Sequence, residues 1–283
     1  MASSTALLSH DWLGACRRSV EGLRGVLAAH RPGAERARET GLAGAGGDRT
    51  LVIDQLAEDL VMEQLGGLHA AGARFTVVSE ECGVIDLGDG GTIVVVDPID
   101  GSLNAKRGLP HHALSIAVAD GPTMADVAFA YVYDFGPGEE WLAERGAGAW
   151  LDGDRVDEVP AERRTSDGRL EVVAVESADP RWLAASSDAL LEHVHRVRAI
   201  GSIAISMCQV AAGRADAMAS LRLCRSVDAA AAQLIVRESG GHVAFGGFSA
   251  PLAAPLADLA ARAPVAAART QRGLAEAQSL HAG

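Results

Sequence analysis

The apolar positions along the chain predict a helical start followed by short strands. Within the first thirty positions, apolar residues recur at helical intervals: Leu8, Trp12, Ala15, Val20, Leu23, Val26 and Leu27. The segment 31–50 is rich in Gly and charged residues and predicts a loop, after which a second helix should run from about Ile53 to Leu65. The stretches RFTVVSEE and GTIVVVDPIDG then show the alternating or continuous apolar pattern of buried strands.

The rest of the chain shows two different patterns. ALSIAVADG and DVAFAYVYDFGPGEEWLAERGAGAWLDGDRV predict antiparallel strands joined by Gly-rich turns. Beyond the hydrophilic stretch 152–168, strands and helices alternate, from the strand LEVVAVES through the single helix PRWLAASSDALLEHV to a final strand, HVAFG. We therefore expect an α+β domain over 1–155 and an α/β domain over 156–283.

Composition and charge narrow the class of protein and its partners. A formal net charge of −12 predicts a soluble chain that binds nucleic acid and anionic membranes poorly. The four cysteines are scattered without a Cys-x-x-Cys motif, which is typical of reduced thiols in a cytosol. The chain starts without a signal-peptide pattern and contains no apolar run of membrane-spanning length, so we expect a cytoplasmic protein.

The stretch VVVDPIDGSLN, residues 94–104, joins a buried strand to a turn crowded with polar residues. Pro98 has no N–H for a sheet ladder, so the chain should leave the sheet at Asp97. Asp97 and Asp100, with the carbonyl of Ile99, could then converge on a hard cation such as Mg²⁺. Gly101 and Ser102 would begin a short helix whose N–H groups suit a phosphate. The alternative is that both aspartates are only turn and cap residues.

Two further acidic positions stand at the ends of expected elements. Glu80 and Glu81 end a strand, and Asp228 begins a helix. Each has a plain alternative, because a strand end is often solvated and an aspartate is a common N-cap. Only their combination with DPIDGS favours a metal centre.

Taken together, these motifs resemble the inositol monophosphatases and the related fructose-1,6-bisphosphatases. DPIDGSLN is similar to the motif Asp-Pro-x-Asp-Gly-Thr-x-Asn with Ser102 in place of Thr. SEE matches the acidic pair upstream of it, and GSIAISMCQVAAGRADA and VDAAAAQLIVRESGG match the later segments in the expected order. The resemblance spans roughly residues 46–268. It implies a layered αβαβα sandwich that combines α+β and α/β parts, as in sugar phosphatases, and a homodimer.

The resemblance also implies a set of metal ligands. Glu80, Asp97 and the Ile99 carbonyl would hold a first Mg²⁺. Asp97, Asp100 and Asp228 would hold a second, and a third ion would bind more weakly through Glu80. Such ions would supply the positive charge that an acidic protein needs to bind an anionic substrate.

The implied reaction is hydrolysis of a phosphate monoester by in-line attack of a metal-activated water. Asp54 would pair with the Ser102 hydroxyl and, aided by Glu80, orient and deprotonate that water. The amides of Gly101 and Ser102 would hold the phosphate. Ser102 keeps the oxygen of the usual Thr, so we expect activity to survive this departure.

The implied substrate is a sugar or cyclitol phosphate, inositol 1-phosphate or fructose 1,6-bisphosphate. Gly201 and Ser202 are the expected contacts in the second half. Leu221 stands where animal inositol monophosphatases carry a substrate-binding Glu, whereas Arg222 and Arg225 resemble the archaeal-type, dual-specificity branch and could bind a second phosphate. Surface roles for both arginines remain open. Related activities on 3′-phosphoadenosine 5′-phosphate or histidinol phosphate, and a regulatory protein-binding role with vestigial catalysis, are the alternatives.

Overall fold

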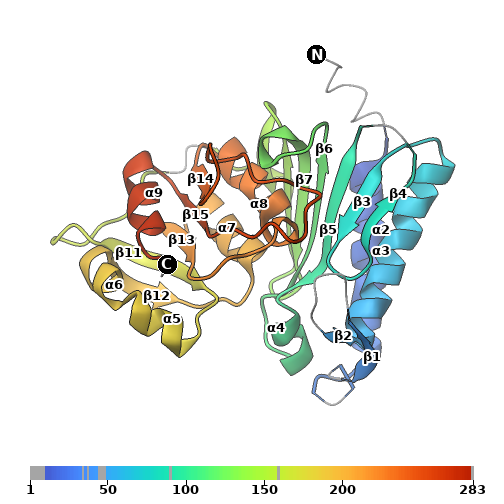
Figure 1. Cartoon of the computed structure of the whole chain (residues 1–283), viewed down its shortest axis with the longest axis horizontal. Coiled ribbons are helices and arrows are strands. Elements are labelled where there is room, and N and C mark those ends of the chain that lie inside the picture. Colours follow the sequence, from blue (N-terminus) through green and yellow to red (C-terminus); the bar gives the residue numbers. More distant parts are fainter. Residues whose placement is uncertain are drawn as a thin grey trace.

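Five layers of helices and sheets make up the computed structural model, which describes residues 10–33, 35–36, 38–43, 49–88, 91–157 and 160–281. Helices flank and separate two sheets (Figure 1). The first sheet has eight strands in the order β10 (Asp154–Arg155), β9 (Gly148–Leu151), β8 (Glu139–Glu144), β7 (Val127–Asp134), β6 (Ala113–Ala119), β5 (Ile93–Asp100), β3 (Thr76–Ser79) and β4 (Gly83–Asp86). The second has five, in the order β12 (Val194–Arg198), β11 (Leu170–Glu176), β13 (Ala217–Ser220), β15 (Val265–Ala268) and β14 (His242–Phe245).

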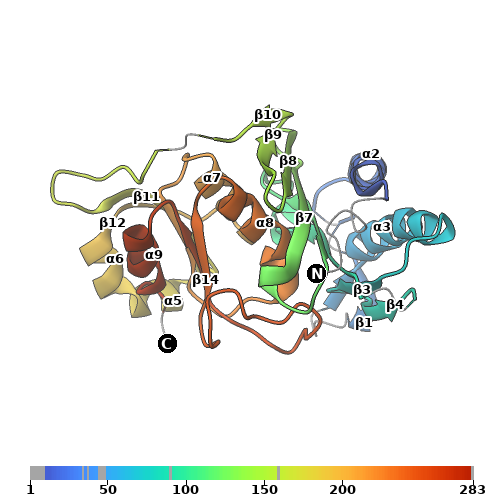
Figure 2. The same cartoon turned by 90° about the horizontal axis from the view of Figure 1, so that it is seen from above.

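The helices occupy three layers around these sheets. The outer layer of the first sheet is α2 (Trp12–Ala29) and α3 (Val52–Ala70), and α7 (Ile203–Ala211) and α8 (Ser226–Glu238) lie between the two sheets (Figure 2). The far side of the second sheet carries α5 (Pro180–Ala185), α6 (Ser187–His193) and α9 (Gln271–Gln278). The short helices α4 (Ser102–Arg107) and η1 (Met124–Asp126) complete the described helices. This arrangement confirms the expected αβαβα sandwich.

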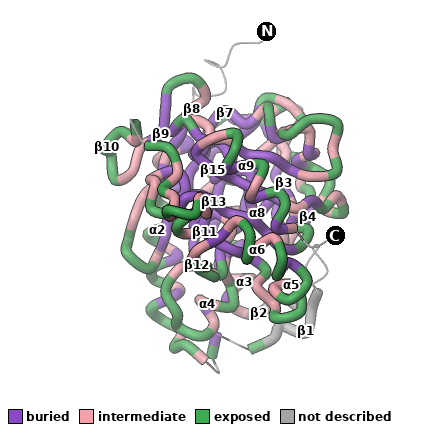
Figure 3. Tube along the Cα trace, turned by 90° about the vertical axis from the view of Figure 1, so that its left-hand side faces the viewer, coloured by how far each residue is buried: buried purple, intermediate pink, exposed green. Residues whose placement is uncertain are grey.

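Helix α8 is buried on all sides at the centre of the molecule. Its residues 229–236 are all buried, beginning with a run of four alanines. A helix that is apolar all round belongs inside a core, and small side chains allow close approach of the sheets on either side. Figure 3 shows that the central strands are buried, whereas outer helices such as α5 and α6 are largely exposed. The N-terminus of α8, where Asp228 lies, is therefore held in a rigid position.

Strand β5 extends further than expected, through the DPID residues of the motif DPIDGSLN. It continues through Asp100, so the expectation that the chain leaves the sheet at Asp97 is wrong. Asp97 faces Ser115 and Asp100 faces Ala113 on β6, so three steps along β5 match two along β6. The extra residue is a β-bulge next to Pro98, which has no N–H for the ladder. Because the bulge offsets the normal alternation of side chains, Asp97 and Asp100 reach the same face of the sheet.

The ends of several elements also differ from expectation. The loop expected over 31–50 contains a hairpin, β1 (Glu39–Ala43) with β2 (Arg49–Leu51). Helix α3 runs five residues beyond Leu65, because Leu68 packs into the core and outweighs the low helix propensity of the glycines before it. Residue Leu8 and the segment 44–48 lie outside the described residues.

The second half departs from expectation in two places. The helix expected after Asp179 is two helices, α5 and α6, interrupted at Ser186. HVAFG is not the final strand, since β15 and α9 follow it. β15 is almost entirely alanine and forms through antiparallel pairing with β13 and β14, which local strand propensity does not reveal.

The boundary between the two sheets falls between Arg155 and Leu170. The division into domains 1–155 and 156–283 stays a prediction, because one buried cluster takes side chains from both sheets, for example Val95 and Ala174. Within the described ranges, no helix combines the length and the apolar character needed to cross a membrane.

Arg36 fastens α4, and with it the turn after β5, to helix α2. Its buried guanidinium donates to the carbonyl oxygens of His30 at 2.8 Å, Ala105 at 2.7 Å and Leu27 at 2.5 Å. We predict that Arg36→Ala lowers the free energy of unfolding by roughly 2 kcal/mol or more, since charge-assisted hydrogen bonds are lost. Urea denaturation would measure this, with the exposed Arg31→Ala as control. Equal stability of the two variants would contradict the prediction.

Candidate metal and phosphate site

A cavity of about 920 Å³ opens between the two sheets. Its walls come from segments far apart in the sequence: the end of β3, the DPIDGS turn, the end of β11, the turn 199–203 and the N-terminus of α8. All twelve site residues predicted from the sequence line this cavity: Asp54, Glu80, Asp97, Ile99, Asp100, Gly101, Ser102, Gly201, Ser202, Arg222, Arg225 and Asp228. The structure thus brings the predicted residues to one place, while their individual roles stay predictions.

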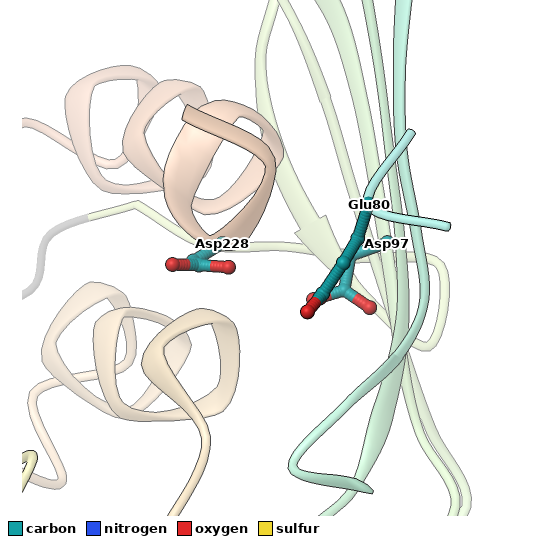
Figure 4. A group of neighbouring side chains, drawn as sticks. All are labelled: Glu80, Asp97 and Asp228. Atoms are coloured by element: carbon teal, nitrogen blue, oxygen red, sulfur yellow. The ribbon is translucent and has the colours of Figure 1, made fainter. Parts of the chain in front are cut away.

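Three carboxylates gather tightly within this cavity. Glu80, directly after β3, Asp97 on β5 and Asp228 on α8 each offer an oxygen, and these oxygens lie within 4.8 Å of one another. Figure 4 shows Asp228 facing Glu80 and Asp97 across the gap between the layers. Closely spaced carboxylate oxygens are the donor set that hard divalent cations prefer. The cluster therefore fits a metal ion by its chemistry.

Asp100 lies beside this group and contacts the second half of the chain. Its Oδ2 accepts the Ser202 hydroxyl at 2.6 Å and the Ala204 N–H at 2.7 Å. Asp97 Oδ1 accepts the N–H of Ile99 at 3.0 Å, across the bulge. These hydrogen bonds hold both carboxylates in fixed orientations while leaving other oxygens for a ligand.

Burial of so many acids makes their ionised forms costly. Burial raises the pKa of Asp100 to about 7, opposed by the hydrogen bond from Ser202. Burial also raises the pKa of Glu80 to about 7, although the positive charge of Arg225 works against it. The pKa of Asp97 is raised well above its usual range, first by burial and then by the charges of Asp100 and Glu80. A bound cation would relieve this cost.

Arg225 supplies positive charge directly to the carboxylate cluster. Its Nη2 lies 2.5 Å from Glu80 Oε1, and its Nε lies 3.8 Å from Asp228 Oδ1. Its backbone N–H also donates to Asp228 Oδ2 at 2.8 Å, so Arg225 is the N-cap of α8 and Asp228, the third residue of the helix, accepts from the N-cap backbone as well as joining the cluster. The alternative that Asp228 is the N-cap itself is therefore wrong, because the helix begins two residues earlier, at Ser226.

The turn after β5 packs closely against the backbone of two other segments of the chain. Gly101 has a φ of 88°, and a Cβ there would lie 2.9 Å from the His111 carbonyl and 3.0 Å from that of Gly201. Only glycine fits without strain. α4 begins at the exposed Ser102, as expected, and the N–H of Asn104 in its first turn donates to the carbonyl of the N-cap residue Gly101 at 2.8 Å.

The remaining predicted contacts line the same cavity in different settings. Asp54 lies in the first turn of α3. The Arg222 guanidinium stacks 5.1 Å from the ring centroid of Trp182 on α5 and forms no ion pair among the described residues. Arg225 is instead engaged with carboxylates, so the two arginines, which the sequence treats alike, differ in their surroundings.

Two cavity residues escaped the sequence reasoning. Glu176, at the end of β11, is a buried carboxylate, and burial raises its pKa to about 7. Trp182 provides the aromatic face under Arg222. The signal available for Glu176 was an apolar run that ends in an acid, VVAVES, the same pattern that drew attention to Glu80.

Comparisons with known proteins show the family of the chain. The model of the inositol monophosphatase family matches residues 17–281. A fructose-1,6-bisphosphatase/inositol-1-monophosphatase of Methanothermobacter thermautotrophicus is 35% identical over 222 residues, which cover 75% of this chain and 76% of the relative. A Nus factor SuhB of Xylella fastidiosa is 32% identical over 203 residues, 70% of either chain.

Solved structures share the fold. A protein of Pyrococcus horikoshii, described as having similarities to inositol-1 monophosphatase, superposes with a TM-score of 0.72 at 24% identity and covers 96% of each chain. With the family model matching nearly the whole chain, the protein belongs to the inositol monophosphatase family.

Proposed function

We propose that the protein is a Mg²⁺-dependent phosphomonoesterase that hydrolyses sugar or cyclitol phosphates, with inositol 1-phosphate and fructose 1,6-bisphosphate as the first candidates. The observation that carries the proposal is the carboxylate cluster of Glu80, Asp97 and Asp228 beside the DPIDGS turn, inside one cavity. The names of archaeal relatives, fructose-1,6-bisphosphatase/inositol-1-monophosphatase, support the same substrate class.

The donor set suits Mg²⁺ better than a softer metal. Oxygen ligands dominate the cluster, and among the described residues no histidine or cysteine belongs to it. Glu80, Asp97, the Ile99 carbonyl, Asp100 and Asp228 would hold two or three ions. When bound, Mg²⁺ supplies the positive charge that activates water and stabilises the leaving oxygen.

The chain's own groups would place and deprotonate the reactants. Asp54 with the Ser102 hydroxyl, aided by Glu80, would orient the attacking water and take its proton. The N–H groups of Gly101 and Ser102, at the start of α4 in the cavity wall, would hold the phosphate. The reaction would proceed by in-line displacement at phosphorus.

Substrate contacts on the far side of the cavity would come from the second half. Gly201 and Ser202 line the wall next to Asp100. Arg222 is better placed than Arg225 to bind a second phosphate, because Arg225 already contacts Glu80 and Asp228. We propose Arg222, supported by Trp182, as the contact for the distal anion of a bisphosphate.

Other members of this superfamily suggest alternatives. Hydrolysis of a nucleotide such as 3′-phosphoadenosine 5′-phosphate, or of histidinol phosphate, would use the same metal ligands. A regulatory, protein-binding role is favoured by one observation, the 32% identity to a Nus factor SuhB. An Asp97→Asn variant that kept its cellular effect would favour that role. The cytoplasmic location and the homodimer expected from the resemblance belong to the same proposal.

The central test is phosphate release by the purified protein. We predict hydrolysis of at least one of the two candidate substrates at millimolar Mg²⁺, and a loss of roughly 10³-fold in kcat/KM for Asp97→Asn, since a carboxylate of the cluster is neutralised. Asp86→Asn, an exposed aspartate at the end of β4, is the matched control and should retain activity. The absence of phosphate release from either substrate by the wild-type protein would refute the proposal.

The raised pKa values predict a pH dependence of stability and metal binding. With chelator present, the folded protein keeps protons on Glu80 and Asp100 up to about pH 7, whereas the unfolded chain releases them near their usual pKa values. Its free energy of unfolding should therefore fall as the pH rises from about 4 to 7. Cation binding needs ionised carboxylates, so Mg²⁺ affinity should rise over this window and protons should be released. Calorimetric titration in buffers of different protonation enthalpy tests this, and a pH-independent affinity would contradict it.

The setting of Arg222 predicts a selective effect on substrates. Arg222→Ala should raise KM for fructose 1,6-bisphosphate by roughly tenfold and leave KM for inositol 1-phosphate within about twofold, because only the bisphosphate carries a second phosphate. Arg181→Ala, an exposed arginine on α5 that pairs with Asp179, is the control. Equal changes for both substrates would argue against the assigned contact.

A further inference from the structure

Glu176 is a buried carboxylate in the cavity wall that the proposed reaction does not use. It ends β11 and is 3% exposed. Its Oε1 accepts the Ile200 N–H at 3.1 Å and the Ser206 hydroxyl at 2.6 Å, and its Oε2 accepts the Gly201 N–H at 2.9 Å. Both oxygens are therefore committed to the turn 200–202 and to the helix α7 that follows it.

That turn is the link between Glu176 and the candidate metal ligands. Ser202 donates its hydroxyl to Asp100 Oδ2, and the Ala204 N–H donates to the same oxygen. The Ile200 carbonyl accepts the Asn104 side-chain amide at 2.8 Å. The turn thus connects β11 of the second sheet to the end of β5 and to α4 in the first half of the molecule.

The backbone around these contacts adopts uncommon conformations. Ser177, directly after Glu176, has a φ of 57°, and Gly201 has a φ of 86°. A side chain on Gly201 would meet the Asn104 amide at 2.8 Å. Left-handed backbone at a non-glycine residue costs free energy and persists where its surroundings impose it, often at functional sites. The turn is therefore held in one position rather than free to relax.

We propose that Glu176 is a positioning residue for the metal site. It fixes the turn 200–202, and the turn, held in this position, orients the carboxylate of Asp100. Both donors from the turn contact Oδ2, which leaves Oδ1 of Asp100 for a cation. Groups that orient a ligand in this way tune metal affinity without touching the metal. This inference rests on the proposed function, because it assigns Asp100 a cation.

A double-mutant cycle tests the link between Glu176 and Asp100. Glu176→Gln keeps the shape but points an NH₂ group at a backbone N–H, and Ser202→Ala removes the hydroxyl donor to Asp100. Each single change should weaken Mg²⁺ binding, measured by calorimetry on the full chain, by about tenfold. The double variant should lose about the same factor rather than the product of the two, because both changes interrupt one series of contacts.

Asp216 offers a matched control for stability. It is 2% exposed and accepts the backbone N–H groups of Arg163 and Val172, each at 2.8 Å, but it does not line the cavity. Asp216→Asn should lower the melting temperature, as Glu176→Gln should, yet leave Mg²⁺ affinity within about twofold of the wild type. Combined with Ser202→Ala, its effect on affinity should be multiplicative.

The outcomes separate this inference from the proposed function. A wild-type protein that binds Mg²⁺ and releases phosphate, with unchanged Mg²⁺ affinity in Glu176→Gln, would overturn the positioning role alone, as would multiplicative losses in the cycle. A wild-type protein that does neither would refute the proposed function itself. If Glu176→Gln fails to fold, Ser206→Ala, which removes one donor to Glu176, replaces it in the cycle, and multiplicative losses there would again overturn the inference.

Discussion

Mutual repulsion between closely spaced carboxylates, of which Asp97 is buried and Glu80 and Asp228 are half-buried, is the constraint on which the rest of the structure depends. Glu80, Asp97 and Asp228 bring their oxygens within 4.8 Å of one another in a cavity wall, and Asp100 lies buried beside them. Burial and like charge both oppose ionisation, so such a cluster is stable only when the fold holds it in place and a positive charge compensates it. Arg225 supplies part of that charge, and a divalent cation would supply more.

Rigid elements hold the acids against this repulsion. Asp228 belongs to the helix α8, which is buried on all sides between the sheets. Asp97 and Asp100 lie on either side of a bulge in β5, which pairs with β6 through Asp100 on one edge and with β3 as far as Val96 on the other. A strand and a buried helix hold side chains more precisely than a loop does, so they can keep like charges at this separation. The Ala-rich composition of α8 therefore serves the site as well as the core.

The sequence predicts the parts of this site that are encoded locally. DPIDGS, SEE and the helix after Asp228 each combine a strand or helix end with acids, and the short helix at Ser102 follows from Gly101. The bulge at Pro98 escaped prediction because it depends on the register between β5 and β6. β15 and the role of Glu176 escaped it for a related reason, since both arise from partners distant in the sequence.

The site is divided between two halves that also hold each other together. Glu80 and Asp97 come from the first sheet and Asp228 from α8, so neither half contains the cluster alone. Asp100 bonds across the junction to Ser202, and Arg225 bonds across it to Glu80. A change in the spacing of the two sheets would therefore alter ligand geometry and charge compensation at once. Contacts at this junction, rather than the ligands alone, determine how well the carboxylates can share a cation.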